Sequence, residues 1–281
     1  MLNSQCVFML AADHRWQWEE WCDARSIPRT RIPEVKRLAA DAFRLARDRS
    51  PRVREFGALL LDAQYATDVI VEARRDNLIV GTPVEKAGAF PLAWSTEPFD
   101  RALIGAFVKV LVRFRPDDAG DIRDGQWQKL DVLQTWCRRA ATPLVVEVLV
   151  PRRQEEEDAF EAVGRPALLA AFISEAYDRG LTPDFWKIEG TQAPEGARTI
   201  DRAIAARPRC RQIILGKAAD LATIERWFAA AADSPTAAGF AIGRSVFWNP
   251  STAFLSGTSS AQASAAEVCA NYLRLVDAWR R

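Results

Sequence analysis

The stretch FVKVLVRF, residues 107–114, is apolar at nearly every position and is interrupted only by Lys109 and Arg113. A strand with one face in water alternates apolar and polar residues, whereas a parallel strand covered on both faces is apolar almost throughout. Valine and phenylalanine also favour extended backbone. We therefore predict that this stretch is a buried parallel strand of an α/β protein.

Similar apolar runs occur along the whole chain, and segments with apolar residues three or four positions apart, typical of amphipathic helices, separate most of them. Eight strands that alternate with helices over about 250 residues predict a (β/α)8 TIM barrel. A doubly wound open sheet is the alternative, but no G-x-G-x-x-G motif follows the first run and no Walker A loop occurs. Without a repeat or a low-complexity linker, we predict one domain over residues 1–281. The other seven predicted strands are 5–13, 56–63, 77–83, 143–151, 184–190, 211–218 and 239–247, and the predicted helices include 32–49, 64–76, 127–140, 165–180 and 221–233.

Composition excludes several classes of function. The 38 lysines and arginines nearly balance the 37 aspartates and glutamates, which argues against a nucleic-acid partner. Five cysteines without C-x-x-C spacing argue against disulfides or zinc, and they favour a reducing cytoplasm. The N-terminal run CVFMLAA is too short to span a membrane and lacks a basic segment before it. We therefore expect a cytoplasmic protein without a metal, a cofactor or a membrane partner.

The chain has a single histidine, His14. A site with several histidine ligands is therefore excluded, and any serine–histidine or cysteine–histidine mechanism would depend on this one residue. Acid–base chemistry must fall mainly to carboxylates and lysines.

Three ionisable residues, Lys109, Glu147 and Lys187, are embedded in the middle of predicted strands. Side chains alternate between the two faces of a strand, so Lys109 and Arg113 share one face. If these faces point into the barrel, two lysines and a glutamate converge on its axis. A lysine buried beside Trp186 and near another cation would lose its charge more readily and could act as a nucleophile. A structural ion pair inside the barrel is the alternative.

Active sites of such barrels lie at the carboxyl ends of the strands, so polar residues there are candidate ligand contacts. Late strands of this fold often bind phosphate through backbone N–H groups and a cation, and the sequence has a glycine followed by a cation at two such ends. Glycines that merely permit tight turns are the alternative. The candidate substrate-binding residues are Asp13, His14, Arg15, Asp62, Glu85, Arg113 and Arg115, and the candidate phosphate-binding residues are Gly216, Lys217, Gly243 and Arg244.

Seven segments in order resemble a known enzyme family: AADHR, LLLDAQYA, VEKAG, VKVLV, VVEVL, FWKIE and FAIGRSVFW. The chain resembles the class I tagatose-bisphosphate aldolases. It is still more similar to the aldolase-like domain, named only as a domain of unknown function (DUF2090), that is fused to bacterial inositol-catabolism kinases. The resemblance runs through most of the predicted barrel.

The resemblance implies a role for several residues. Lys187 would form a Schiff base with the substrate ketone, Lys109 and Glu147 would assist proton transfer, and Gly243 with Arg244 would hold a phosphate. The implied reaction is metal-independent cleavage of 6-phospho-5-dehydro-2-deoxygluconate to dihydroxyacetone phosphate and malonic semialdehyde. The chain departs from the family at His14, where those aldolases have glutamine, and in the arginine-rich segment VRFRPDD. The extra arginines of this segment, Arg113 and Arg115, predict a substrate with a second anionic end, such as a carboxylate.

Three alternatives stay open at this stage. The substrate could be another phosphorylated sugar, such as tagatose bisphosphate or a sulfonated fructose phosphate. The protein could instead be a non-catalytic module that senses a sugar phosphate, although such a module does not need an embedded amine. The aromatic segment RWQWEEWCD, residues 15–23, could cover the barrel or form a contact in a homo-oligomer.

Overall fold

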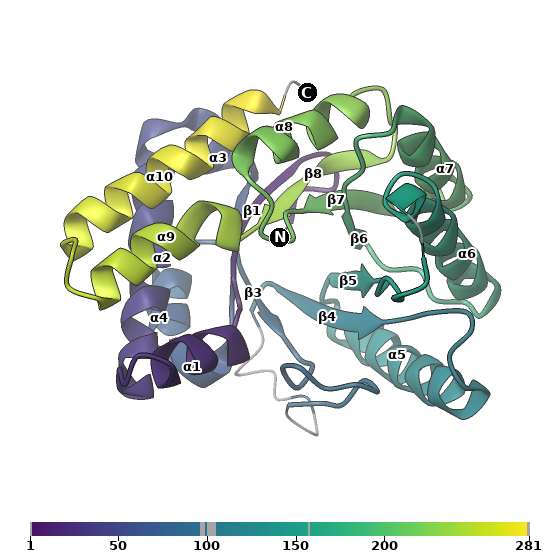
Figure 1. The fold of residues 1–281 in the computed structure, drawn as a ribbon, viewed down its shortest axis with the longest axis horizontal. Helices are drawn as coiled ribbons and strands as arrows, with labels where there is room; N and C mark the ends of the chain where they lie inside the picture. Colours follow the sequence, from purple (N-terminus) through teal and green to yellow (C-terminus); the bar gives the residue numbers. More distant parts are fainter. Residues whose placement is uncertain (1, 96–98, 100–104, 157, 280–281) are drawn as a thin grey trace.

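In the computed structural model, which describes residues 2–95, 99, 105–156 and 158–279, eight parallel strands close into a barrel in sequence order. Figure 1 shows helices around most of the outside of the barrel, with a gap at the bottom of the view. The (β/α)8 prediction is therefore confirmed. The strands are β1 (Val7–Ala12), β2 (Gly57–Leu61), β3 (Val80–Pro83), β4 (Phe107–Arg113), β5 (Leu144–Leu149), β6 (Phe185–Glu189), β7 (Arg211–Leu215) and β8 (Ala237–Ile242).

The helices cover the outer faces of these strands, and α10 packs against α2 and α9. No helix in the described part of the chain is long and apolar enough to cross a membrane. The α-helices are α1 (Trp16–Asp23), α2 (Ile32–Arg49), α3 (Pro51–Phe56), α4 (Ala63–Arg75), α5 (Gly120–Ala140), α6 (Gly164–Asp178), α7 (Pro194–Ala205), α8 (Leu221–Ala230), α9 (Arg244–Leu255) and α10 (Ala261–Ala278), with short 3-10 helices η1 (Arg29–Arg31) and η2 (Asp158–Phe160).

The inside of the barrel has an apolar floor. Met9, Phe107, Val145, Phe185 and Ile213 are fully or almost fully buried and pack together there. Phe107 fills this floor so closely that a Cβ on Gly81 would lie 2.1 Å from its ring, and a glycine is therefore required on β3. Because these side chains fill one end of the barrel interior, only the part near the carboxyl ends of the strands is left for polar groups.

Strand register sets the height of the polar residues above this floor. Lys109 pairs with Val145, while Glu147, two residues further along β5, pairs with Lys187 of β6. These side chains face inward, because each lies an even number of positions from an inward-facing residue of the floor. The predicted convergence of Lys109, Glu147 and Lys187 inside the barrel is present.

The prediction of the last strand is wrong at its carboxyl end. It was expected to continue to residue 247, but β8 ends at Ile242 and α9 begins at Arg244. Valine and phenylalanine within RSVF suggested a strand, and a short apolar run does not distinguish a strand from a buried helix. The seventh strand likewise ends at Leu215 rather than at residue 218.

Candidate active site

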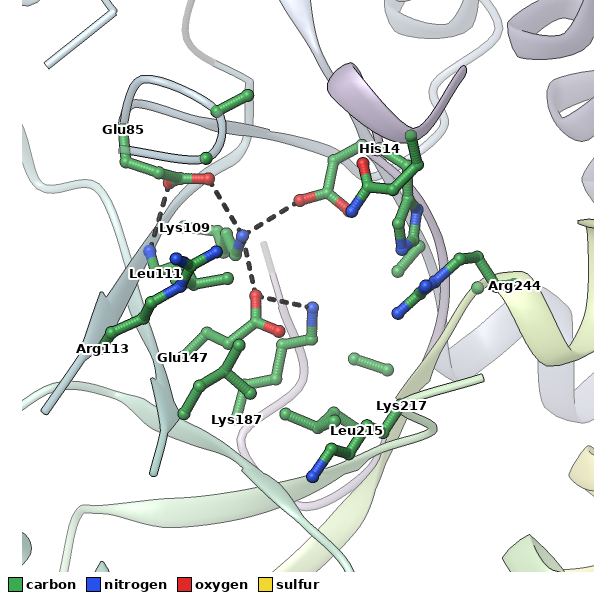
Figure 2. Close-up of a pocket in the computed structure, with 18 of the residues that line it drawn as sticks. His14, Glu85, Lys109, Leu111, Arg113, Glu147, Lys187, Leu215, Lys217 and Arg244 are labelled. Atoms are coloured by element: carbon green, nitrogen blue, oxygen red, sulfur yellow. Dashed lines mark hydrogen bonds and ion pairs between the residues drawn. The ribbon is translucent and has the colours of Figure 1, made fainter. Parts of the chain in front are cut away.

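A cavity of about 420 Å³ opens at the carboxyl ends of the strands, where the sequence placed the site (Figure 2). Most of the predicted residues line it, and they come from strands on all sides of the barrel. They are Asp13, His14, Arg15, Glu85, Lys109, Arg113, Glu147, Lys187, Gly216, Lys217, Gly243 and Arg244.

At the centre of the cavity, one carboxylate oxygen bridges two lysines. Oε2 of Glu147 lies 3.0 Å from Nζ of Lys187 and 2.7 Å from Nζ of Lys109. All three side chains are at least nine-tenths buried. This geometry lets a proton pass between Lys187 and Glu147 without any movement of the backbone.

Lys109 is surrounded by carboxylates. Its Nζ contacts Oδ2 of Asp13 and Oε1 of Glu85, each at 3.1 Å, besides Glu147. Burial alone would lower the pKa of Lys109, but the charges of Asp13, Glu147 and Glu85 outweigh it and raise that pKa above its ordinary value. Burial favours protonated Asp13 and Glu147, yet Lys109 and Lys187 hold the pKa of both carboxyls below the usual range. Lys109 is therefore a fixed ammonium group.

The prediction that Lys187 lies in apolar surroundings is wrong. Trp186 points to the opposite face of β6, where its Nε1 donates to the hydroxyl of Tyr177 at 3.0 Å and its ring contacts Phe172. Consecutive residues of a strand face opposite sides, so Trp186 cannot touch the Lys187 amine. The amine lies instead in a polar layer, where Glu147 is its partner.

Arg15 and Glu85 form a buried clamp beside this layer. Arg15 donates to Oε1 of Glu85 at 3.0 Å and to its backbone oxygen at 2.9 Å. The other carboxylate oxygen of Glu85 accepts from the backbone N–H of Leu111 at 3.2 Å. The clamp fixes the oxygen that contacts Lys109, so Arg15 acts here through Glu85.

His14 lines the cavity as a neutral imidazole. Burial is the main cause that lowers its pKa to about 3, and nearby Arg244, Lys36 and Lys187 add to the effect against the charge of Asp13. The ring packs edge-on against Phe247. Its buried Nδ1 has no hydrogen-bond partner among the described residues. Such a group can bind an uncharged oxygen of a ligand.

The junction of β8 and α9 has the chemistry of an anion site. Arg244 is the first residue of α9, and a helix N-terminus carries unpaired N–H groups and partial positive charge. A Cβ on Gly243 would lie 2.0 Å from the oxygen of Ala11 and 2.8 Å from Cε1 of His14, so only glycine fits there. Burial lowers the pKa of Arg244, while Glu147 and Asp13 oppose this shift.

Lys217 lines the cavity but is already paired within the protein. Its Nζ donates to Oε2 of Glu189 at 2.7 Å. Gly216, the residue before it, directly follows the last residue of β7. We did not predict Glu189 as a site residue. The alternation of β6 could have found it, because Glu189 lies two positions after Lys187 and therefore faces the same side.

The structure does not bring Asp62 to the cavity. Its carboxylate caps α4 by accepting from the N–H of Tyr65 at 2.9 Å, and it forms a buried ion pair of 2.6 Å with Lys36. Lys36 in turn donates to the carbonyl oxygens of Ala12 and His14 at the end of β1. We therefore correct the expected location of Asp62: it supports the end of β1 from outside the cavity.

Arg115 also lies outside the cavity. Its guanidinium binds Glu156 at 2.7 Å, Asp117 at 2.9 Å and the carbonyl oxygen of Pro151 at 2.7 Å. These contacts join the loops that follow β4 and β5. Of the two arginines predicted to meet a second anionic end of the substrate, only Arg113 lines the cavity.

The described residues contain no group of three or more histidine, cysteine, aspartate or glutamate side chains arranged to hold a metal ion. Three carboxylates of the cavity, those of Asp13, Glu85 and Glu147, are grouped around Lys109.

Solved structures with the same architecture include two fructose-bisphosphate aldolases. One is the Schiff-base-forming fructose-1,6-bisphosphate aldolase studied through its reaction intermediates, with 17% identity, coverage of 97% of this chain and 94% of that chain, and a TM-score of 0.59. An archaeal fructose-1,6-bisphosphate aldolase has 15% identity, coverage of 98% and 94%, and a TM-score of 0.59. A structural-genomics protein from Corynebacterium glutamicum has 14% identity, coverage of 97% and 88%, and a TM-score of 0.60. At these identities the likeness shows a shared fold.

A comparison with curated protein sequences gave no match. One family profile, described as an uncharacterized protein conserved in bacteria (DUF2090), matches residues 2–281. The match covers the barrel and every residue of the cavity, and the chain therefore belongs to the DUF2090 family.

Proposed function

We propose that this protein is a class I aldolase whose Schiff-base lysine is Lys187. The observation that carries the proposal is the shared carboxylate oxygen of Glu147, which contacts both Lys187 and the permanently charged Lys109. A binding site for a sugar phosphate does not need a buried amine with its own proton acceptor. The resemblance to tagatose-bisphosphate aldolases supports the same role for Lys187.

The contacts support a sequence of steps. Glu147 takes the proton of Lys187, and the free amine attacks the ketone carbon to give a carbinolamine. A protonated Glu147 can then donate to the leaving hydroxyl, so that water departs and an iminium remains. The iminium accepts the electron pair of the breaking carbon–carbon bond while a base takes the proton of the β-hydroxyl group. Protonation of the enamine carbon and hydrolysis release the second product and restore Lys187.

In this proposal Lys109 stays charged throughout. Its ammonium, fixed by Asp13 and Glu85, stabilises negative charge on Glu147 and on a substrate oxygen as it loses its proton. The iminium serves as the electron sink, so the proposed reaction needs no metal ion.

The cavity suits a substrate with two anionic ends. Figure 2 shows Arg113 and Arg244 on either side of the Lys187 amine. Neither guanidinium forms an ion pair within the described residues. Arg244 at the start of α9 would bind the phosphate, and Arg113 at the end of β4 would bind the other end.

We propose 6-phospho-5-dehydro-2-deoxygluconate as the substrate, cleaved to dihydroxyacetone phosphate and malonic semialdehyde in the cytoplasm during inositol catabolism. Its phosphate and carboxylate flank the ketone, which fits the placement of Arg244 and Arg113. Another phosphorylated sugar, such as tagatose bisphosphate or a sulfonated fructose phosphate, remains the second candidate, because Arg113 would bind a phosphate or a sulfonate equally well. A contact between subunits through α1 stays a prediction from the sequence, since Trp18 and Cys22 of that helix are buried within the chain itself.

Borohydride trapping tests the proposed function. Incubation with dihydroxyacetone phosphate and borohydride should add the mass of the reduced ligand to the peptide that contains Lys187. A Lys187→Met variant should not be labelled there. Labelling of another lysine, or of none, would contradict the assignment. A panel of phosphorylated sugars and sugar acids, assayed for dihydroxyacetone phosphate release, then identifies the substrate.

A further inference from the structure

Glu189 is a buried carboxylate in the wall of a cavity that we expect to bind anions. Its side chain is only 3% exposed, and it lines the cavity two positions beyond Lys187 on β6. Burial raises the pKa of its carboxyl above the ordinary value, although Arg165 and Lys217 pull in the other direction. The proposed reaction does not use this group. A carboxylate here opposes the binding of any phosphorylated ligand, and its presence therefore requires a reason.

One oxygen of Glu189 holds two cations. Oε2 accepts from Nζ of Lys217 at 2.7 Å and lies 3.0 Å from a terminal nitrogen of Arg165. Arg165 is 5% exposed and is also paired with Glu161, whereas Lys217 is 46% exposed. Figure 2 shows the amine of Lys217 pointing away from Arg244. Of the two cations, Lys217 is therefore the one that can reach a ligand.

We propose that Glu189 competes internally for Lys217, holding this lysine in the empty site and releasing it to the phosphate of a bound ligand. The inference rests on the phosphate subsite of the proposed function. The exchange leaves no unpaired buried carboxylate, because Glu189 keeps Arg165 when Lys217 leaves. Its effect is to weaken the affinity for phosphorylated ligands, which favours release of a phosphorylated product after cleavage.

The test measures binding of inorganic phosphate by calorimetry, because binding does not depend on catalysis. Glu189→Gln keeps the size and an acceptor oxygen but removes the charge, and we expect it to tighten phosphate binding by about tenfold, as removal of one negative charge near a dianion should do. Glu161→Gln is the matched control, because it removes a carboxylate from the same arginine outside the cavity, and it should change binding by less than about twofold. Lys217→Met should weaken binding and abolish the gain from Glu189→Gln in the double variant.

Two results would overturn the inference. One is unchanged or weaker phosphate binding in a folded Glu189→Gln variant, and the other is an equal gain with and without Lys217. If Glu189→Gln does not fold, Lys217→Met alone tests the inference. Unchanged phosphate affinity in Lys217→Met would refute it, because Lys217 would then not move from Glu189 to the phosphate. Borohydride trapping with unphosphorylated dihydroxyacetone separates the two proposals. Loss of labelling at Lys187 refutes the aldolase chemistry, while the phosphate titrations still report on Glu189.

Discussion

Glu147→Gln is the substitution that most directly tests the proposed chemistry. Glutamine has the size of glutamate but cannot take a proton from Lys187. Around the centre of the cavity, Asp13, Glu85 and Glu147 balance Lys109, Lys187 and Arg15, so the substitution leaves one excess positive charge. Lys109 still keeps two carboxylate partners.

The size of the effect follows from these contacts. Loss of a positioned acid–base group typically lowers kcat by about 10²- to 10⁴-fold, which corresponds to about 2.7–5.5 kcal/mol of transition-state free energy. The fold should survive, because Asp13 and Glu85 continue to pair with Lys109. We therefore expect a large fall in kcat with little change in the midpoint of thermal unfolding.

The assay has two parts. Steady-state cleavage, followed by dihydroxyacetone phosphate release, gives kcat and KM. Rapid borohydride quenching gives the rate of Schiff-base formation, which we expect to fall together with cleavage because Glu147 acts in both steps that lead to the iminium. Lys109→Met and the double variant, which carries Glu147→Gln and Lys109→Met together, complete a double-mutant cycle. This cycle measures the coupling free energy between Glu147 and Lys109.

A near-normal kcat in Glu147→Gln would refute this reasoning, provided that the protein is folded. Glu147 would then be a structural counter-ion that only neutralises the two lysines. Effects of Glu147→Gln and Lys109→Met that simply add in the double variant would also contradict the reasoning, because they would show that the function of Glu147 does not depend on the charge of Lys109.

The remaining predictions concern other groups of the cavity. Arg244→Ala should raise KM for a phosphorylated substrate by about 10²-fold and leave an unphosphorylated analogue nearly unaffected, since a charge-assisted contact to phosphate is lost; equal losses on both substrates would point to a structural role. Turnover should persist in EDTA, and a complete loss restored by zinc would contradict an iminium electron sink. The folded-state pKa of His14 is about 3, below the ordinary 6.5, so protons bind the unfolded chain preferentially as the pH falls below 6.5. Acidification from pH 7 to pH 5 should therefore lower the unfolding midpoint of the native chain more than that of His14→Gln, as measured by thermal melts, and an equal decrease would contradict the buried neutral imidazole.

The inward-facing residues were predictable because strand alternation is a local rule. Lys109, Glu147 and Lys187 interrupt apolar runs, and a barrel brings the same face of each strand to one axis. The same rule applied to β6 would have included Glu189. Strand alternation also places Trp186 and Lys187 on opposite faces of β6. The prediction of an apolar pocket around Lys187 did not take this into account.

Positions at strand ends were less predictable. Asp62 and Arg115 both follow strands, yet the first caps α4 and pairs with Lys36, and the second binds Glu156 across two loops. The direction of a side chain beyond the last strand residue depends on the turn that follows, and sequence spacing does not specify that turn. The buried position of Lys36 could have been predicted, since this residue lies four positions after the buried Ile32 on the apolar face of α2.

The distribution of charge inside the barrel also limits the kind of ligand that fits. The chain as a whole has a formal net charge of only +1, and the central carboxylates of the cavity are matched by Lys109, Lys187 and Arg15. Arg113 and Arg244 add positive charge to the cavity wall without an ion pair in the described residues, and an unneutralised guanidinium near a low-dielectric site favours an anion. An uncharged sugar would leave both groups without a counter-charge, whereas a ligand with a phosphate and a second anionic group would neutralise both. In the proposed exchange at Glu189, Arg113 and Arg244 would continue to bind such a ligand while Glu189 competes with its phosphate for Lys217.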